Sequence, residues 1–486
     1  MFYRNHIIIL LTLSFFIISC NKTKKEEFGK YLALNYKNKN YKKFNSDEYN
    51  KVFELEMKRL NKSLHERTQI NKLYSGEDSN LIMLNKFLFN NQLDTLSFYL
   101  KNAKYHGLNP NYLHADSINK ILKILKSTKF KNVNKIYSHL ARLELYSADA
   151  FINYVNILKY GAINPKTILS TYYVSIKRPT YDDALNTLSQ ADLVNYLKEV
   201  QPKNGYYQRL MNLLINEGKN NSKAIMKLEK RKIYLSMERL RWPVDEYKGK
   251  YLLVNIPEYQ LRLINNNKTV IQMKVCVGEA GGHETPILSG LVNHMQVNPV
   301  WNIPQSIANK EILESLKKDE SYLESHDMVA YKKDSLIESY SVDWSKVQPD
   351  EYSFKQNPGA DNSLGLIKFL FHNPYAIYLH DTPAKAKFNE EMRAVSHGCV
   401  RVEKPMLLAE FLLNNKEETE RIIKETEATL KGEKAVARWV NIKNPLPVFI
   451  SYYTAFTDDF GNLITSDDVY GYDKLLLSKF EKFMAN

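Results

Sequence analysis

Two histidines and one cysteine late in the chain have the types and spacing for thiol chemistry. Strand-like apolar residues lead into His380 and into the run Ser396-His397-Gly398-Cys399. A free cysteine is only a few per cent thiolate at neutral pH, so a nucleophilic thiol needs a base, and His380 or His397 could supply it. Gly398 lets the backbone turn sharply, so that amide N–H groups can point at a developing oxyanion. The pattern indicates acyl transfer by Cys399.

The two histidines differ as candidates for the base. His397 precedes Cys399 by two residues, but the intervening Gly398 favours a turn over a strand that would align their side chains. His380 comes from a separate strand end and can be placed freely. Buried inert cysteines and structural histidines are common, so this cluster alone also fits a metal site or core packing.

The other two cysteines need separate explanations, because an odd count argues against a disulfide scaffold. Cys276 lies in the strand-like segment 273–277 between apolar neighbours, which predicts a small buried hydrophobe. No C-x-x-C pattern occurs, so we expect no metal, and thiol acyl transfer needs no cofactor. His283 and His372 are expected to be structural or exposed.

Cys20 ends an apolar N-terminal run. Arg4 and His6 precede Ile7–Ile18, which is too short for a comfortable membrane span and is typical of a secretory signal. Ser19-Cys20 then resembles the end of a bacterial lipoprotein signal, where the cysteine is lipidated. An uncleaved anchor or ordinary secretion is the alternative. We expect a signal peptide over 1–20, a flexible tether over 21–45 and a periplasmic protein anchored to the inner or outer membrane.

The secondary-structure elements that must position these reactive residues fall into two halves of the chain. Up to about Glu238, apolar residues recur at three- and four-residue spacing, as in Asp47–Leu64 and Ala184–Val200, which predicts helices. Gly107–Pro110 and Gly161–Pro165 each combine glycine, asparagine and proline, which predicts a break between helices. His106, His114 and His139 lack partners at ligand spacing, and we expect surface or core roles for them.

The second half is rich in β-type residues from about residue 245. Tyr251–Asn255, Tyr259–Ile264 and Val270–Val277 are predicted strands, with a turn at Asn265–Asn267. A chain of 486 residues with 44% hydrophobic and 25% charged residues fits two or three soluble domains. The net charge of +14 comes from scattered lysines without a nucleic-acid motif, so we expect no nucleic-acid partner.

The segment Ser396-His-Gly-Cys-Val-Arg401, with a histidine about twenty residues upstream, resembles the signature of the L,D-transpeptidase (YkuD-type) catalytic domain. The resemblance covers roughly residues 230 to 475 and is closest to the enlarged Gram-negative branch of that family. It rests on further segments: 231–242, 253–257, 298–304, 342–344, 362–365 and 452–455.

The resemblance implies a role for each residue of the motif. Cys399 would be the nucleophile, and His380 the general base, held by the backbone carbonyl of Asp381. The amides of Gly398 and Cys399 would form the oxyanion hole, and His397 would shape the loop or assist there. The resemblance further suggests residues near the substrate, with core packing as the alternative for the last two: Arg401, Ser396, Tyr378 and Trp301.

The resemblance also implies an architecture. We expect an α+β multidomain chain: a mostly α-helical scaffold domain over 46–240, then a mainly antiparallel β-sandwich catalytic domain over 245–415 with a capping insertion at 306–356. Residues 416–486 would be an extension that packs on the catalytic domain. Relatives often carry a peptidoglycan-binding module, but only about residues 210–228 are available for it here, which is too short.

The implied activity is the formation of 3-3 cross-links between peptidoglycan stem peptides through a cysteinyl acyl-enzyme. Carbapenem-type lactams would then be covalent inhibitors. Hydrolysis of the same bonds by an L,D-carboxypeptidase or amidase uses the same residues and stays open, as does an inactive wall-binding lipoprotein scaffold. The residues do not indicate a protein partner for the helical domain.

Overall fold

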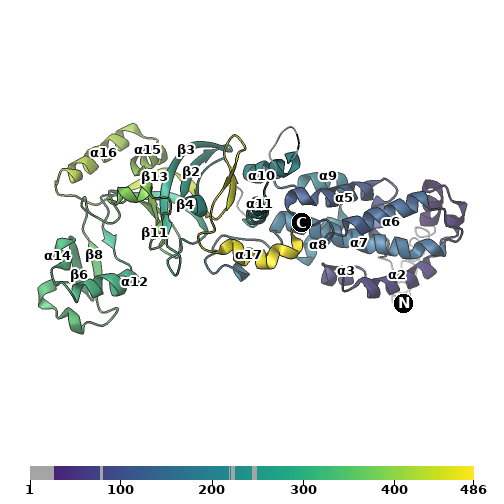
Figure 1. Ribbon diagram of the computed structural model, residues 1–486, viewed down its shortest axis with the longest axis horizontal. Helices are drawn as coiled ribbons and strands as arrows, with labels where there is room; N and C mark the ends of the chain where they lie inside the picture. The colour runs from purple at the N-terminus through teal and green to yellow at the C-terminus, as the bar shows by residue number, and fades with distance from the viewer. Residues whose placement is uncertain (1–26, 77–79, 218, 220–224, 244–248, 486) are drawn as a thin grey trace, which may run out of the picture.

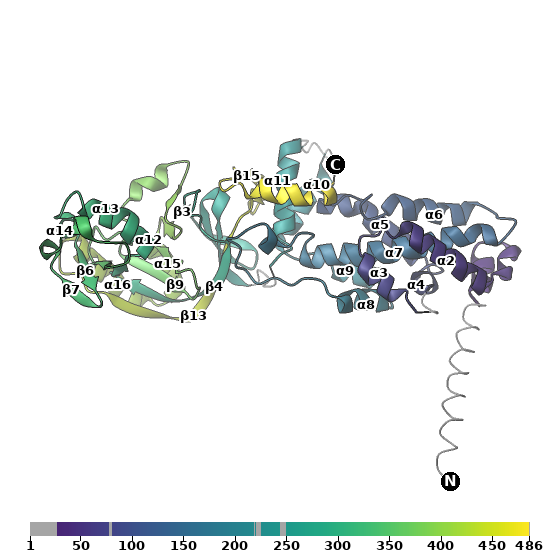
Figure 2. The same cartoon turned by 90° about the horizontal axis from the view of Figure 1, so that it is seen from below.

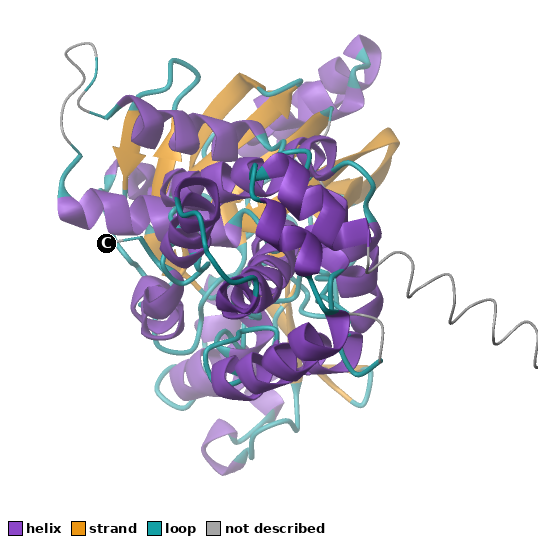
Figure 3. Cartoon of the chain, turned by 90° about the vertical axis from the view of Figure 1, so that its right-hand side faces the viewer, coloured by secondary structure: helices purple, strands orange, loops and turns teal. Residues whose placement is uncertain are grey.

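The computed structural model describes residues 27–76, 80–217, 219, 225–243 and 249–485. The molecule is elongated, with a helical half at one end and a β-rich half at the other (Figure 1). An end view places the helices in front of the strands (Figure 3). Among the described residues, no helix combines the length and apolar character needed to cross a bilayer. The predicted signal peptide and Cys20 lie outside the described residues.

The helical half is built around one long helix, α7 (Asn134–Tyr160), whose residues are mostly buried. Both predicted breaks are confirmed: α7 ends before Gly161, and Gly107 follows a 3-10 turn, each glycine with a φ of 72°. The predicted helix over 184–200 is two helices, because Asp192 caps a new one. The other helices are α2 (Ser46–Leu60), α3 (Arg67–Leu73), α4 (Ile82–Phe87), α5 (Gln92–Lys101), α6 (Ala115–Ser127), α8 (Tyr181–Ser189), α9 (Leu193–Glu199), α10 (Gly205–Asn216) and α11 (Lys227–Arg239).

The expected flexible tether over 21–45 is wrong for its described part. Residues 27–35 are helical, and a 3-10 helix follows at Lys39–Lys43. Phe28 and Leu32 are fully buried, and the Phe28 ring packs edge-on against Phe44 at 5.3 Å. Their spacing of four residues puts both on one helix face, so this segment belongs to the helical domain.

The β-rich half contains, among the described residues, a nine-stranded sheet in the order β11-β3-β12-β10-β9-β4-β13-β1-β2. Strand β2, the last in this order, also pairs with β3, the second. The sheet therefore closes on itself, and the expected sandwich is closed where β2 meets β3. Most pairs are antiparallel, and three are parallel: β1 with β13, β10 with β12 and β11 with β3. The strands are β1 (Lys250–Asn255), β2 (Gln260–Asn265), β3 (Lys268–Gly278), β4 (Leu288–Val297), β9 (Ile367–Phe371), β10 (Leu379–His380), β11 (Ala394–Ser396), β12 (Val400–Val402) and β13 (Arg438–Ser451).

The expected domain boundary at residue 415 is wrong. Strand β13 lies inside the sheet, antiparallel to β4 on one side and parallel to β1 on the other. The catalytic fold therefore needs residues that we assigned to an extension. Two helices before this strand, α15 (Pro405–Leu413) and α16 (Lys416–Leu430), pack on the sheet, and Arg438 of β13 pairs with Glu418 and Glu425 of α16 at 2.7 and 2.8 Å.

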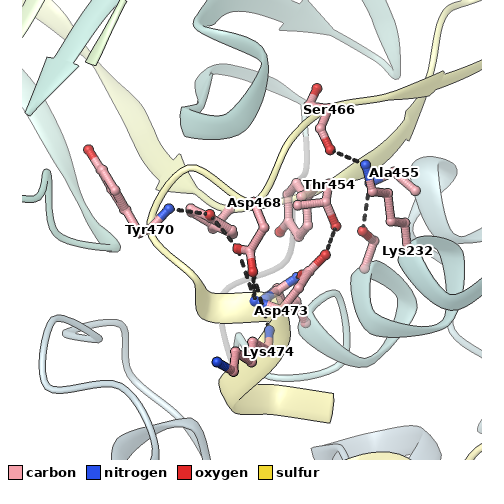
Figure 4. A network of polar contacts seen from close by, with 12 residues as sticks. Lys232, Thr454, Ala455, Ser466, Asp468, Tyr470, Asp473 and Lys474 are labelled. Carbon is pink, nitrogen blue, oxygen red and sulfur yellow. Dashed lines mark hydrogen bonds and ion pairs between the residues drawn. The ribbon is translucent and has the colours of Figure 1, made fainter. Parts of the chain in front are cut away.

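The end of the chain joins the two halves. Helix α17 (Tyr472–Phe480) lies beside α11 in both side views (Figures 1 and 2). Asp473 accepts from Arg239 of α11 at 2.5 Å and from the hydroxyl of Thr454 at 2.6 Å, and the Lys232 ammonium reaches the Ser466 carbonyl at 2.6 Å. Figure 4 shows this polar network. Buried charge-assisted bonds of this kind fix the orientation of the elements that they join.

The predicted capping insertion forms its own small core. Strands β5 (Trp301–Asn302), β8 (Ser353–Gln356), β6 (Met328–Lys332) and β7 (Ser335–Ile337) pair as a second sheet. Helical residues 305–316 include a π-helical turn, η5 (Ala308–Ile312), and α14 spans Tyr322–Ser325. Apolar side chains from Ile303 to Phe354 cluster separately from the main core. The insertion thus begins at Trp301, slightly earlier than predicted.

Candidate active site

Strand register aligns the chemically important side chains in one row. His380 of β10 lies opposite Lys368 of β9 and opposite Arg401 of β12, and Arg401 lies opposite Cys276 of β3. Directly opposed residues project from the same face of a sheet. The neighbouring Leu379 is fully buried in the main core on the other face. A histidine between two cations therefore lies immediately beside the loop that carries Cys399.

The His380 ring is fixed and neutral. Its Nδ1 lies 2.5 Å from the carbonyl oxygen of Asp381, the partner that the family resemblance implies. Burial, with Arg401 nearby, lowers the pKa of His380 to about 3. A carbonyl accepts only from an N–H, so the bond to Asp381 favours the tautomer with the proton on Nδ1, and the ring also bonds with the Leu364 backbone. A general base needs this tautomer, because Nε2 is then the acceptor.

The Asp381 carboxylate has a structural role. It accepts a hydrogen bond from the Leu366 amide at 3.0 Å and pairs with the Lys385 ammonium. Gly365 makes this possible, because its φ is 61° and a Cβ there would lie 2.5 Å from the Asp381 carboxylate. Asp381 therefore supports His380 through its carbonyl, while its side chain holds the loop behind the ring.

The Cys399 thiol lies close to the residues that precede β10. Its sulfur is 3.7 Å from the carbonyl oxygen of Ala376, and it also bonds with the amide and the hydroxyl of Tyr378. Burial raises the pKa of Cys399, while Tyr378, Lys368 and Arg401 act against that increase. Within the described residues the sulfur makes no hydrogen bond to His380, so the thiol is protonated and turned toward Tyr378.

Lys368 was not predicted from the sequence. Its ammonium lies 3.8 Å from the centre of the Tyr378 ring, and burial lowers its pKa while the charge of Cys399 raises it. Tyr378 and Trp301 were predicted to line the pocket, and the Trp301 indole bonds with the Tyr378 hydroxyl. Because Trp301 begins the cap, the cap contacts the residue that holds the thiol.

One of the two amides expected in the oxyanion hole already has a partner in the resting loop. The Gly398 amide donates to the Ser396 hydroxyl at 3.2 Å, and that hydroxyl donates to the Cys399 carbonyl at 2.6 Å. Ser396 is buried and braces the loop through these two bonds, and its contact with substrate stays a prediction. Thr285 fixes the turn further by donating to the Gly398 carbonyl at 2.8 Å. In the described part of the chain, only the Cys399 amide of this pair lacks a partner and can face an oxyanion.

His397 contacts the cap. Its Nε2 lies 2.6 Å from Oε1 of Glu311, on the π-helical turn of the insertion. Its ring meets His283 edge-on at 4.8 Å. Both partners are partly exposed, with 36% and 48% of their side-chain surfaces accessible. His397 therefore links the nucleophile loop to the cap, which agrees with a loop-shaping role.

The helical half also reaches this site. Tyr173 donates its backbone amide to Ile287 at 2.8 Å, and its ring stacks on Tyr375 with 3.6 Å between centroids. Tyr375 immediately precedes Ala376, whose φ is 53° and whose carbonyl faces the thiol. This contact cannot be predicted from a local sequence pattern, because the two tyrosines are some 200 positions apart.

The remaining predicted residues are placed clearly. Cys276 is completely buried, which confirms the structural prediction, and burial raises its pKa. Arg401 is half-buried, and its Nε is buried without a hydrogen bond among the described residues. His372 is exposed. Arg401 is thus a cation near the Cys399 thiol, and its Nε could donate a hydrogen bond to a ligand.

Comparison with known proteins agrees with this geometry. Residues 249–431 match the model of the L,D-transpeptidase catalytic domain (YkuD), and residues 68–214 match the Scaffold domain. The chain is 34% identical over 245 residues to a Haemophilus influenzae protein named "Putative L,D-transpeptidase". That match covers 50% of this chain and 48% of the relative, so the chain spans about half the length of the relative. The protein thus carries a Scaffold domain followed by a catalytic domain of the YkuD-type L,D-transpeptidase family.

Proposed function

We propose that this protein is a peptidoglycan L,D-transpeptidase that forms 3-3 cross-links through a thioester on Cys399. The observation that carries the proposal is the Cys399 thiol beside a strand that presents the neutral, carbonyl-bound ring of His380. A neutral imidazole next to a thiol is the arrangement that thiol acyl transfer requires. Trp301 and Glu311 of the cap contact Tyr378 and His397, so the cap lies against the residues around the thiol.

The first step acylates Cys399. Since the thiol bonds to Ala376 in the resting structure, its side chain must first turn toward His380, which takes the proton. The sulfur attacks the carbonyl between the third stem residue, at the L-centre of a diamino acid, and the terminal D-residue. The carbon–sulfur bond forms, the carbon–nitrogen bond breaks, and His380 gives the proton to the departing D-amino acid. The Cys399 amide donates to the oxyanion.

The second step transfers the acyl group to an amine. The side-chain amine of another stem peptide attacks the thioester, the carbon–sulfur bond breaks, and His380 returns the amine's proton to the sulfur. One amide replaces another, so the cycle needs no external energy source. Hydrolysis by water is the alternative second step, and the same residues would serve it.

The two cations beside the thiol favour the binding of an anionic substrate. Lys368 and Arg401 flank His380 on the same face, and stem peptides carry free carboxylates on the diamino acid and on the terminal D-residue. An arginine matches a carboxylate with two donors, and a partly buried lysine adds charge. We therefore assign carboxylate recognition to Arg401, with Lys368 closer to the sulfur.

The lipid anchor belongs to the same proposal. A lipid on Cys20 would hold the protein at the periplasmic side of the inner or outer membrane, where its substrate lies. Cys20→Ala should release the protein into the soluble periplasmic fraction or leave an uncleaved precursor. Wild-type protein that carries no lipid and has the full precursor mass would contradict the anchor.

Product analysis separates the candidate activities. Purified protein would be incubated with a disaccharide-tetrapeptide and its products identified by mass spectrometry. A 3-3 linked dimer with free D-amino acid supports transpeptidation, whereas a tripeptide alone supports a carboxypeptidase. Unchanged substrate with a correctly folded wild type would contradict the proposal.

A further inference from the structure

Three side chains in the helical domain bring metal-binding atoms together. His65 lies between α2 and α3, His114 directly precedes α6, and Asp149 lies within α7. Their donor atoms all lie within 4.8 Å of one another, and Nε2 of His114 is 3.0 Å from Oδ2 of Asp149. The three come from separate segments, so their convergence is a product of the tertiary fold.

Two of the three side chains, Asp149 and His65, are oriented by groups outside the cluster. Oδ1 of Asp149 accepts from the amides of His65 and Glu66 at 2.9 and 2.7 Å, which leaves Oδ2 directed at His114. The His65 ring bonds with the backbone carbonyl of Tyr112 and stacks on the Tyr112 ring at 3.7 Å. Outer hydrogen bonds that fix ring orientation are the usual surroundings of metal-bound histidine and carboxylate.

The burial of the three side chains leaves one side of the cluster open to a cation. The side chain of Asp149 is fully buried and that of His114 is 10% exposed, whereas His65 is exposed. A cation could therefore enter from the His65 side.

We propose that His65, His114 and Asp149 form a site for a zinc-like divalent cation. Two imidazole nitrogens and one carboxylate oxygen are a donor set that Zn²⁺ takes at about 2.0–2.2 Å, with water in a fourth position. Tetrahedral coordination at those lengths needs donors about 3.3 Å apart, so modest side-chain rotations complete the site. Mg²⁺ and Ca²⁺ are disfavoured, because they prefer oxygen ligands.

The cation would stabilise the domain and its contact with the chain end. His65 and Asp149 are 84 positions apart, so a metal between them closes a long loop. Tyr112, which holds His65, packs on Phe483 with 4.7 Å between ring centroids, and Phe483 accepts the Asn109 amide at 2.7 Å. Metal binding should therefore also order the C-terminal residues against the helical half.

The test uses full-length protein carrying Cys399→Ser, which removes the half-buried active-site thiol as a competing ligand, after treatment with a chelator. Titration with ZnCl₂ by calorimetry, and with CoCl₂ by visible absorption, should give one site per chain, a tetrahedral cobalt spectrum and a raised Tm. His65→Ala should weaken binding at least about tenfold. His139→Ala, which removes a histidine of α7 outside the cluster, should bind like the parent.

Three results would overturn the site. They are absence of binding in the parent protein, equal binding by His65→Ala, and equal loss in His139→Ala. His65 is exposed, so its replacement should leave the fold intact, and circular dichroism without metal would verify this. Because the readout is metal binding, the result is independent of the proposed transpeptidase activity.

Discussion

Replacing Tyr378 with phenylalanine isolates the contribution of one hydroxyl to the nucleophile. The hydroxyl bonds with the Cys399 sulfur, and the ring, which stays, lies 3.8 Å below the Lys368 ammonium. A hydrogen bond to a charged group contributes about 1.5–3 kcal/mol. At about 1.4 kcal/mol per factor of ten, the thiolate fraction at a fixed pH should fall roughly tenfold to a hundredfold.

The assay is the rate of alkylation of Cys399 by iodoacetamide at pH 7, followed by intact mass. Cys276 should not be alkylated, because it is completely buried. Tyr375→Phe is the matched control, since the Tyr375 hydroxyl pairs with Tyr173 instead of the sulfur, and its rate should stay near that of wild type. An unchanged rate in Tyr378→Phe, or the same decrease in both variants, would refute this account of the thiol.

Three further predictions concern the base, the cap and pH. A carbapenem should acylate Cys399 but not Cys276, and His380→Ala should slow that acylation far more than His397→Ala in single-turnover mass spectrometry; equal rates would remove His380 as the base. Glu311→Gln should raise KM while leaving Tm nearly unchanged, because exposed ion pairs contribute only about 0–1 kcal/mol; a large loss of Tm would show that the pair is structural. Burial lowers the pKa of His106 and of His380 to about 3 from 6.5. The unfolded chain therefore binds protons that the folded chain does not as pH falls from about 6.5 to 3. Urea unfolding should show stability decreasing over that range, and the decrease should be smaller in His106→Gln; an identical slope would contradict the assignment.

The sequence predicted those residues whose roles follow from a short motif or from their neighbours in the chain. Cys399, His380 and the carbonyl of Asp381 lie in one short stretch with a recognisable motif, and the Cys276 burial followed from its apolar neighbours. Strands β1 to β3 and the breaks at Gly107 and Gly161 were likewise visible, because alternation and turn residues act over a few positions.

The residues that the sequence did not predict acquire their roles from contacts between segments that are distant in the chain. Lys368 acquires its role from the register of β9 against β10, and Glu311 and Tyr173 reach the site from the cap and the helical half. The place of β13 in the sheet is equally non-local, because its partners β1 and β4 precede it by more than a hundred residues. The folded segment after residue 26 could have been found, since Phe28 and Leu32 are spaced as one helix face.

The most direct test of the central claim is the intact mass of the protein after incubation with a stem tetrapeptide in the absence of an acceptor, quenched in acid. We predict a mass increase equal to the donor less its terminal D-amino acid, located by peptide mapping on Cys399, present in Cys276→Ser and absent in Cys399→Ser. An adduct that persists in Cys399→Ser, or that maps to another residue, would contradict the assignment of Cys399 as the nucleophile.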